Sequence, residues 1–169
     1  MKTIRILQLS DIHWKKQRDA ADDYTDIRDK MLQDLNYYCQ ETGNSFDKIL
    51  ICGDIAFSGS VDEYKRANSF IRDLCKTVAC KSEEVYTVPG NHDKNVNEHP
   101  KCVREFIHQA ISNRWNDCDW LWNKMIDEDF SFIKKLYTPF KEYNNFCNDG
   151  KRLRVYTLPF IVKVLTFAP

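Results

Sequence analysis

The chain has 169 residues, and its 25 lysine and arginine residues balance its 25 aspartate and glutamate residues, so the formal net charge is zero. This length suits a single domain with a buried core. The neutral balance argues against a protein that grips nucleic acid mainly through its phosphates. A composition with 43% hydrophobic and 30% charged residues excludes disordered and membrane-spanning classes.

The predicted elements alternate between short apolar runs and amphipathic helical patterns. Apolar runs bounded by Gly, Asp or Pro predict buried strands at residues 3–9, 48–52 and 84–88. Apolar residues at helical spacing predict helices at residues 25–41 and 62–79, the second with Asp62 as its N-cap. The order β-α-β-α-β favours an α/β fold with a parallel sheet and helices on its faces.

The chain changes character after the third predicted strand. Residues 101–148 are rich in aromatic and charged side chains at helical spacing, which predicts a helical cap or insertion. Its aromatic residues either line a substrate pocket or pack the helices against the sheet, and the second alternative is commoner. A strand-like run at residues 153–167 then leads to Pro169 with no closing helix. We therefore expect residues 1–169 to form one domain that is incomplete at its C-terminal end.

The cysteines and the N-terminal segment bear on the compartment. The seven cysteines are odd in number and contain no Cys-x-x-Cys pair, so a disulfide scaffold and a zinc ribbon are both disfavoured. Only a few apolar residues precede Asp11, too few for the apolar region of a signal peptide. We therefore expect a cytoplasmic protein that has no membrane partner.

Polar side chains follow each of the three predicted strands. In chain order they are Asp11 and His13, then Asp54, then Asn91 and His92. Each motif alone has an ordinary explanation. The first could be a surface Asp–His pair, the second a turn, and the third a type II turn at residues 88–91.

Taken together, the three motifs predict a metal site. The carboxyl ends of parallel strands meet at one edge of a sheet, so these five side chains are expected to converge there. Two carboxylates packed together repel each other unless a cation offsets their charge. Carboxylate and amide oxygens beside imidazole nitrogen suit Mn, Fe or Zn, and suit Mg less naturally. An aspartate that offers both oxygens can bridge two such ions.

In this pattern the chain resembles the calcineurin-like metallophosphoesterases. That family carries Asp-x-His, Gly-Asp and Gly-Asn-His-Asp/Glu motifs, each after a strand, and this chain has them in order at residues 11–13, 53–54 and 90–93. The spacing of 43 and then 37 residues between the motifs also resembles the family. The resemblance covers about residues 3–95 and implies an αββα sandwich, here truncated after its first strands.

The resemblance implies a role for each residue at a dinuclear site. Asp11 and His13 would hold the first metal ion, Asp54 would bridge both ions, and Asn91 would bind the second. His92 would be the catalytic residue, either as general acid on the leaving oxygen or as a stabiliser of phosphoryl charge. The aspartate that follows it would hold His92 in position rather than contact a metal ion.

The C-terminal histidine motifs of the family have no counterpart in this sequence. Members carry a further histidine after the third motif and a late Gly-His-x-His, whereas this chain has no histidine after His108. Either the chain is a truncated part of a longer phosphoesterase, which is the favoured explanation, or His99 and His108 complete the site. The competing functional hypothesis is a non-catalytic remnant that binds at most one metal ion.

The resemblance also implies a reaction and a class of substrate. The expected activity is hydrolysis of phosphate mono- or diesters with two divalent metal ions, acting on a small phosphate ester. Residues 53–64 resemble the cyclic-nucleotide phosphodiesterase branch of the family. Nucleic acid stays open as a substrate, but the neutral net charge disfavours it. The oligomeric state is left open by the sequence.

Overall fold

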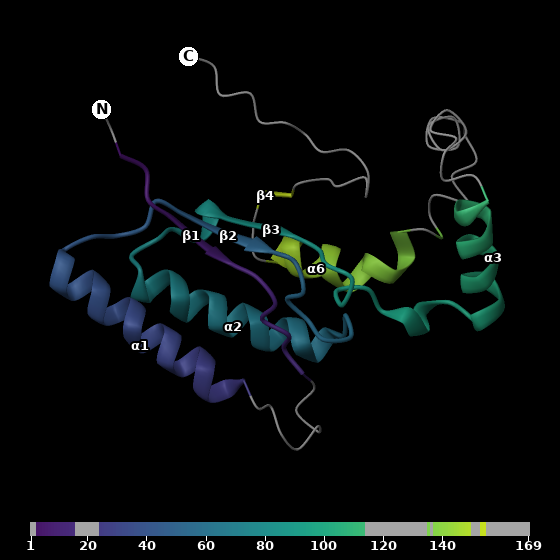
Figure 1. The fold of residues 1–169 in the computed structure, drawn as a ribbon, viewed down its shortest axis with the longest axis horizontal. Helices are drawn as coiled ribbons and strands as arrows, with labels where there is room; N and C mark the ends of the chain where they lie inside the picture. The colour runs from purple at the N-terminus through teal and green to yellow at the C-terminus, as the bar shows by residue number, and fades with distance from the viewer. Residues whose placement is uncertain (1–2, 16–23, 114–134, 136, 150–152, 155–169) are drawn as a thin grey trace, which may run out of the picture.

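The computed structural model describes residues 3–15, 24–113, 135, 137–149 and 153–154. Four parallel strands form one sheet in the order β1-β2-β3-β4 (Figure 1). They span Ile6–Leu9 (β1), Lys48–Cys52 (β2), Val85–Val88 (β3) and Leu153–Arg154 (β4). The three predicted strands and their parallel arrangement are confirmed. Of the strand-like run at 153–167, residues 155–167 lie outside the described part of the chain.

Helices separate the strands as the apolar spacing predicts. Helix α1 spans Thr25–Thr42 and α2 spans Val61–Thr77, each within two residues of its predicted bounds. The remaining elements are the helices α3 (Lys101–Ser112) and α6 (Lys141–Asp149) and the short turns η1 (Ser82–Glu84), η2 (Val96–Glu98) and η3 (Thr138–Phe140). None of these described helices combines the length and the apolar character that crossing a membrane requires.

The core lies on one face of the sheet. Alternation along β2 and β3 turns Ile49, Ile51, Val85 and Thr87 to this face, where each is at most 3% exposed. Helices α1 and α2 lie side by side beneath it (Figure 1). Helix α6 joins this layer, because the Tyr143 hydroxyl lies 2.8 Å from Thr87 Oγ1. The described helices that pack on the sheet therefore cover one of its faces rather than both.

The start of helix α2 corrects one prediction. Its N-cap is Ser60 and not Asp62, whose side chain is 73% exposed. The cause is the buried Glu63, whose carboxylate accepts hydrogen bonds from the Ser60 amide at 2.9 Å and the Ser58 amide at 3.0 Å. This Ser-x-x-Glu capping box fixes the loop that leads from β2 into the helix.

Aromatic residues of α6 pack into the core. The Phe146 ring lies 5.0 Å from the Tyr64 ring of α2, and the Tyr143 ring lies 6.3 Å from it, measured between centroids. Both side chains of α6 are almost fully buried. These two residues therefore pack α6 against α2 in the core, and Tyr143 also reaches Thr87 of β3. The aromatic residues between 114 and 134 lie outside the described part.

Candidate metal centre

The loops after β1 and β2 are joined by backbone hydrogen bonds beyond the ends of the strands. Three amides within residues 11–14 donate to the carbonyl groups of residues 53–55 over 2.9–3.3 Å. Trp14 then pairs with Ala56 as an isolated parallel bridge. These contacts bring His13 and Asp54 to the same edge of the sheet.

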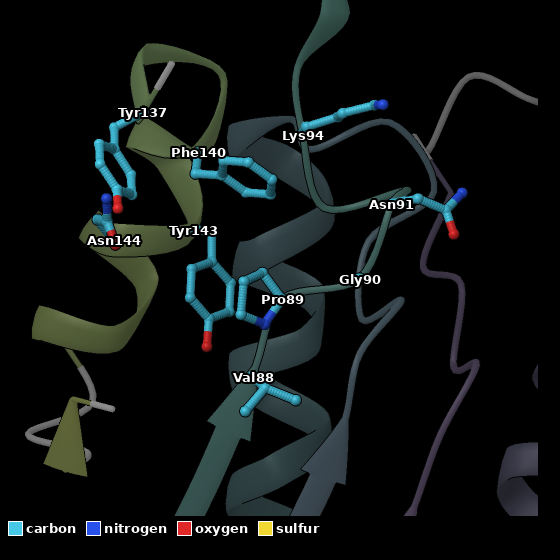
Figure 2. Close-up of a pocket in the computed structure, with 9 residues that line it drawn as sticks. All are labelled: Val88, Pro89, Gly90, Asn91, Lys94, Tyr137, Phe140, Tyr143 and Asn144. Atoms are coloured by element: carbon cyan, nitrogen blue, oxygen red, sulfur yellow. The ribbon is translucent and has the colours of Figure 1, made fainter. Parts of the chain in front are cut away.

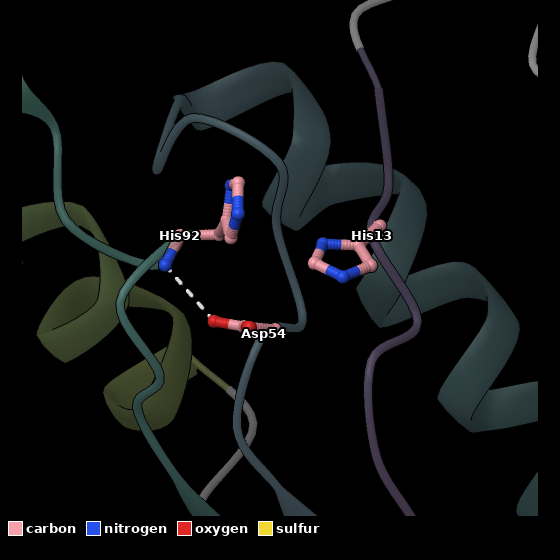
Figure 3. Close-up of side chains that lie close together, drawn as sticks. All are labelled: His13, Asp54 and His92. Carbon is pink, nitrogen blue, oxygen red and sulfur yellow. Dashed lines mark hydrogen bonds between the residues drawn. The ribbon is translucent and has the colours of Figure 1, made fainter.

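Three side chains meet at this edge, one from each strand-end loop: His13, Asp54 and His92 (Figure 3). One imidazole nitrogen from each histidine and one carboxylate oxygen all lie within 4.8 Å of one another. The two imidazole rings meet edge to face with their centroids 4.8 Å apart. The arrangement is a candidate set of ligands for a metal ion.

His92 is fixed by two hydrogen bonds. Its amide donates to Asp54 Oδ1 at 2.9 Å, and its Nδ1 lies 2.9 Å from the carbonyl oxygen of Phe57. Because a carbonyl group only accepts, Nδ1 carries the proton in this contact. Atom Nε2 is then the nitrogen available to a metal ion or to a substrate oxygen.

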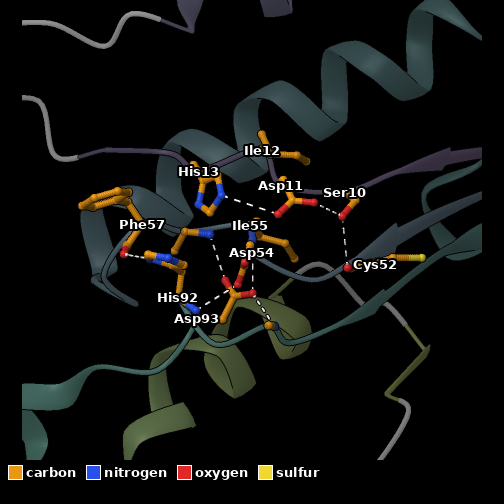
Figure 4. A network of polar contacts seen from close by, with 12 residues as sticks. Ser10, Asp11, Ile12, His13, Cys52, Asp54, Ile55, Phe57, His92 and Asp93 are labelled. Carbon is orange, nitrogen blue, oxygen red and sulfur yellow. Dashed lines mark hydrogen bonds and ion pairs between the residues drawn. The ribbon is translucent and has the colours of Figure 1, made fainter.

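Asp11 lies beside this group of three rather than within it. Its Oδ1 is 3.7 Å from His13 Nε2, and its other carboxylate oxygen accepts a hydrogen bond from the Ser10 hydroxyl (Figure 4). The Asp11 side chain is 65% exposed, whereas that of His13 is 22% exposed. Asp11 can therefore approach a cation from the open side of the site.

Backbone strain marks three of the predicted ligands. Asp11, His13 and Asp54 have φ values of 57°, 51° and 52°, in the left-handed region. Holding a residue other than glycine in such a conformation costs of order 1–3 kcal/mol. In the described part of the chain, Ala79 is the one further non-glycine residue with positive φ. The concentration of strain in these two loops indicates that they are shaped for a site rather than for stability.

Asp93 anchors the loop that carries His92. Its carboxylate is fully buried and accepts hydrogen bonds from the amides of residues 55–56 and Gly90, over 2.8–3.1 Å (Figure 4). It also accepts a hydrogen bond from the Tyr64 hydroxyl at 3.0 Å. Burial raises the pKa of Asp93 above its usual value, and these donors oppose that rise. Asp93 thus acts on His92 through the backbone of the loop.

Gly90 is explained by a close approach rather than by a turn. A Cβ atom at this position would lie 2.1 Å from Asp54 Oδ1 and 2.5 Å from the Asp54 amide nitrogen. Positive φ occurs at the other described glycines and not at Gly90. A type II turn needs positive φ at its third residue, so the turn considered for residues 88–91 is wrong. Glycine is present because the loop passes against the Asp54 carboxylate.

Asn91 lies at the border of a cavity of about 410 Å³ (Figure 2). The loop after β3 forms one side of this cavity, and Tyr137, Phe140 and Tyr143 form the aromatic wall across from it. The Asn91 side chain points away from these three rings. Its amide group is therefore directed out of the aromatic part of the cavity.

The two histidines considered as substitute ligands make other contacts. His99 Nε2 donates to the carbonyl group of Lys135 at 2.7 Å. His108 Nδ1 lies 3.5 Å from the Ser112 hydroxyl on helix α3. Neither belongs to the group formed by His13 and its two neighbours among the residues that the structure describes.

The donor set fits a divalent transition metal. His13 Nδ1 is buried and has no hydrogen-bond partner among the described residues. Buried polar atoms ordinarily have hydrogen-bond partners, so this nitrogen without one supports a role for His13 in binding a metal ion. Two imidazoles with a shared carboxylate match the preference of Mn, Fe and Zn for mixed nitrogen and oxygen ligands.

Sequence analysis missed the residues that support the site. Glu63 was signalled by the Ser-x-x-Glu pattern of the capping box. Tyr64 carried no signal, because its contact with Asp93 joins residues that are 29 positions apart. Arg28 also carried none, although its guanidinium donates to the Ile12 carbonyl at 3.2 Å.

Comparisons with known proteins bear on this geometry. Over 90 residues, or 53% of the chain, the sequence is 33% identical to a Bacillus subtilis (strain 168) protein described as the uncharacterized metallophosphoesterase-like protein YydB. The alignment covers 18% of that protein, so the chain spans less than a fifth of this relative. The sequence pattern of the calcineurin-like phosphoesterases matches residues 4–163. The chain, with its mixed α/β fold, therefore belongs to the calcineurin-like phosphoesterase family.

Proposed function

We propose that this chain carries the metal centre of a phosphoesterase that hydrolyses phosphate mono- or diesters at a dinuclear site. The observation that carries this proposal is the meeting of His13, Asp54 and His92 within 4.8 Å at the carboxyl edge of the sheet. Family membership supports the reaction class. The strained ligand loops support a site built for chemistry.

Each predicted ligand has a role in this proposal. Asp11 and His13 would hold the first ion, Asp54 would serve both ions, and Asn91 would bind the second. The ions are Mn, Fe or Zn, with Mg a poorer match beside imidazole. When bound, they neutralise phosphoryl charge and lower the pKa of the attacking water. The buried hydrogen bonds of Asp93 hold the loop after β3 against the loop after β2.

His92 is the proposed catalytic residue. Its Nδ1–H is held by the Phe57 carbonyl group, so the ring keeps one orientation and presents Nε2. From Nε2, a protonated ring can donate to the leaving oxygen as a general acid, or it can donate a hydrogen bond to a phosphoryl oxygen. The amide bond to Asp54 ties the position of His92 to that of the proposed bridging ligand.

The proposed substrate is a small phosphate ester. The resemblance of residues 53–64 to the cyclic-nucleotide phosphodiesterases makes a cyclic phosphodiester a specific case to test. The net charge of zero disfavours a long nucleic acid as the substrate. The odd number of cysteines, with no Cys-x-x-Cys pair in the sequence, supports a cytoplasmic setting.

A competing proposal is a chain that keeps the scaffold and lacks turnover. It would bind at most one metal ion through Asp11, His13 and Asp54. The observation that favours it is the engagement of His99 and His108 elsewhere, which leaves the proposed second ion with Asp54 and Asn91 as its ligands in the described part.

Hydrolysis of bis(p-nitrophenyl) phosphate with added Mn²⁺ separates the two proposals. We expect Mn²⁺-dependent release of p-nitrophenol that falls at least 100-fold in Asp54→Ala and in His92→Gln. Asp62→Asn is the matched control, since this acid is exposed at the start of α2. Asp54→Ala should also lose Mn²⁺ affinity, and the Mn²⁺ affinity of His92→Gln shows whether this imidazole binds the metal ion or acts on the substrate. No turnover from folded wild-type chain that binds one equivalent of Mn²⁺ would favour the non-catalytic proposal.

A further inference from the structure

We propose that Arg28 and Arg66 are positioning residues that hold the loop of residues 11–15, and with it His13, in place at the metal centre. They do so from helices α1 and α2, through contacts with the backbone of the loop and with the ring of Trp14. We call the two arginines and this tryptophan the arginine clamp. Its effect on metal binding rests on the proposed function, whereas its effect on the loop does not.

The backbone groups of the loop form hydrogen bonds with two sets of residues, the loop after β2 and the two arginines. The loop's amides donate to residues 53–55, as described above. Three of its carbonyl groups accept from the arginines, whereas that of Trp14 accepts from the Phe57 amide at 3.0 Å. Arg28 Nη2 donates to the carbonyl oxygens of Ile12 at 3.2 Å and of His13 at 3.5 Å. Arg66 Nη1 donates to the carbonyl oxygen of Lys15 at 2.6 Å. The loop is therefore held on both sides along its length.

The ring of Trp14 joins the two arginines. The guanidinium carbon of Arg28 lies 3.7 Å from the ring centroid, and that of Arg66 lies 4.8 Å from it. Trp14 is 9% exposed and Arg28 is 5% exposed, so the cation–π contact with Arg28 is shielded from water. One arginine comes from α1 and the other from α2, which ties the loop to both helices of the core.

These contacts require the shape of arginine as well as its charge. A planar guanidinium can lie on an aromatic face while its edge donates to carbonyl groups. The ammonium of lysine is a compact charge on a flexible stem and cannot make both contacts at once. A lysine in place of Arg28 or Arg66 therefore keeps the charge and loses the clamp.

The loop needs such a clamp because its conformation is strained. Asp11 and His13 both have positive φ, with Ile12 between them. Without restraint from the carbonyl side, these residues can relax to ordinary backbone conformations. The His13 ring would then leave the position in which it lies 4.8 Å from the His92 ring. The clamp thus makes the position of His13, the proposed metal ligand, depend on the packing of α1 and α2.

Two measurements on the full chain test this proposal. Hydrogen–deuterium exchange of the metal-free protein reports the opening of the loop, and Mn²⁺ titration followed by electron paramagnetic resonance reports ligand presentation. The variants are Arg28→Lys and Arg66→Lys. The matched control is Arg72→Lys, an exposed arginine on the same helix as Arg66. We expect both clamp variants to speed loop exchange at least tenfold and to weaken Mn²⁺ binding about 10- to 100-fold.

Each outcome of these measurements either supports or overturns the arginine clamp. Helix α2 should keep wild-type protection in both clamp variants, and the control should match wild type throughout. Loop exchange at the wild-type rate would overturn the proposal, as would faster exchange with unchanged Mn²⁺ affinity. Loss of protection throughout the chain in both variants would also overturn it, since the arginines would then serve the fold in general. If wild type binds no Mn²⁺, the proposed function fails, and the exchange rates alone decide whether the clamp exists.

Discussion

At the candidate metal centre, a single added atom can disturb the geometry, and Gly90 is the clearest case. A methyl group there would occupy the space of Asp54 Oδ1, at 2.1 Å. We expect Gly90→Ala to displace this carboxylate, to weaken Mn²⁺ binding at least tenfold and to lower the free energy of unfolding by about 2 kcal/mol. Isothermal titration with Mn²⁺ and thermal unfolding of the same samples measure the two effects.

Gly43 provides the control for this substitution. It has a φ of 63° at the end of α1, and a Cβ there would meet no atom within 4 Å. Gly43→Ala should therefore cost about 1 kcal/mol from backbone strain while Mn²⁺ affinity stays at the wild-type value. Wild-type Mn²⁺ affinity in Gly90→Ala would show that the Asp54 carboxylate is not a ligand, or that the loop yields to the extra carbon.

The residue scale also shows what sequence could and could not predict. That His13, Asp54 and His92 lie close together could be predicted, because each comes within four residues of the end of an apolar strand and parallel strands end at one edge. The need for glycine at position 90, where a side chain would clash with Asp54, could not be predicted, because this contact joins two loops that are 36 positions apart. The burial of Asp93 was hidden for the same reason. Local patterns reveal ligand types, while the contacts that hold them depend on how the loops approach.

At the scale of elements, one ion pair joins the sheet to the turn before β3. Lys48 Nζ of β2 lies 2.5 Å from Glu84 Oε2 of η1 and 3.2 Å from the Tyr86 hydroxyl of β3. The hydrogen bond from Lys48 lowers the pKa of Glu84, and the hydrogen bonds to Glu84 and Tyr86 raise the pKa of Lys48. Both side chains are partly exposed, so salt screens the pair.

The pKa shifts fix the pH window in which this pair stabilises the fold. The Glu84 contribution is present above the ordinary pKa of 4.5 and is lost as the pH falls through the lower folded value. The Lys48 contribution is present below the ordinary pKa of 10.5 and is lost as the pH rises through the higher folded value. The pair therefore stabilises the fold between about pH 4.5 and 10.5.

Thermal unfolding of Glu84→Gln tests this window. We expect a Tm slightly below that of wild type at pH 7, a smaller gap in 1 M NaCl, and a narrower gap at pH 3, because the contribution of Glu84 is lost as the pH falls below 4.5 toward its lowered pKa. Glu83→Gln, at an exposed position in the same turn, should follow wild type at all three conditions. A gap that is equally large at pH 3 would mean that Glu84 acts through packing instead of charge.

The elements themselves were largely predictable. Strands β2 and β3 form where apolar residues run between Gly, Asp and Pro, and α1 forms where apolar residues recur at helical spacing. The N-cap of α2 was mistaken because Asp62 satisfies a local rule, whereas the buried Glu63 satisfies three donors at once. Tertiary burial overrode local propensity at that position.

At the scale of the whole molecule, the candidate metal centre joins segments that only the folded chain brings together. His13, Asp54 and His92 are separated by about 40 residues at each step, so the unfolded chain has no comparable site. Anything that binds this group stabilises the native state by mass action. The stability of the whole chain therefore reports the site without any assumption about turnover.

We expect Mn²⁺ to raise the Tm of the wild-type chain and EDTA to reverse the rise. At a free concentration 100 times Kd, the linkage is worth about 2.7 kcal/mol, or about 5–10 °C for a chain of this size. Asp54→Asn should remove the rise because it removes the negative charge of the Asp54 carboxylate, a proposed metal ligand. Asp62→Asn should keep the rise. A Tm that ignores Mn²⁺ in wild type, or an equal rise in Asp54→Asn, would contradict a metal centre at this edge of the sheet.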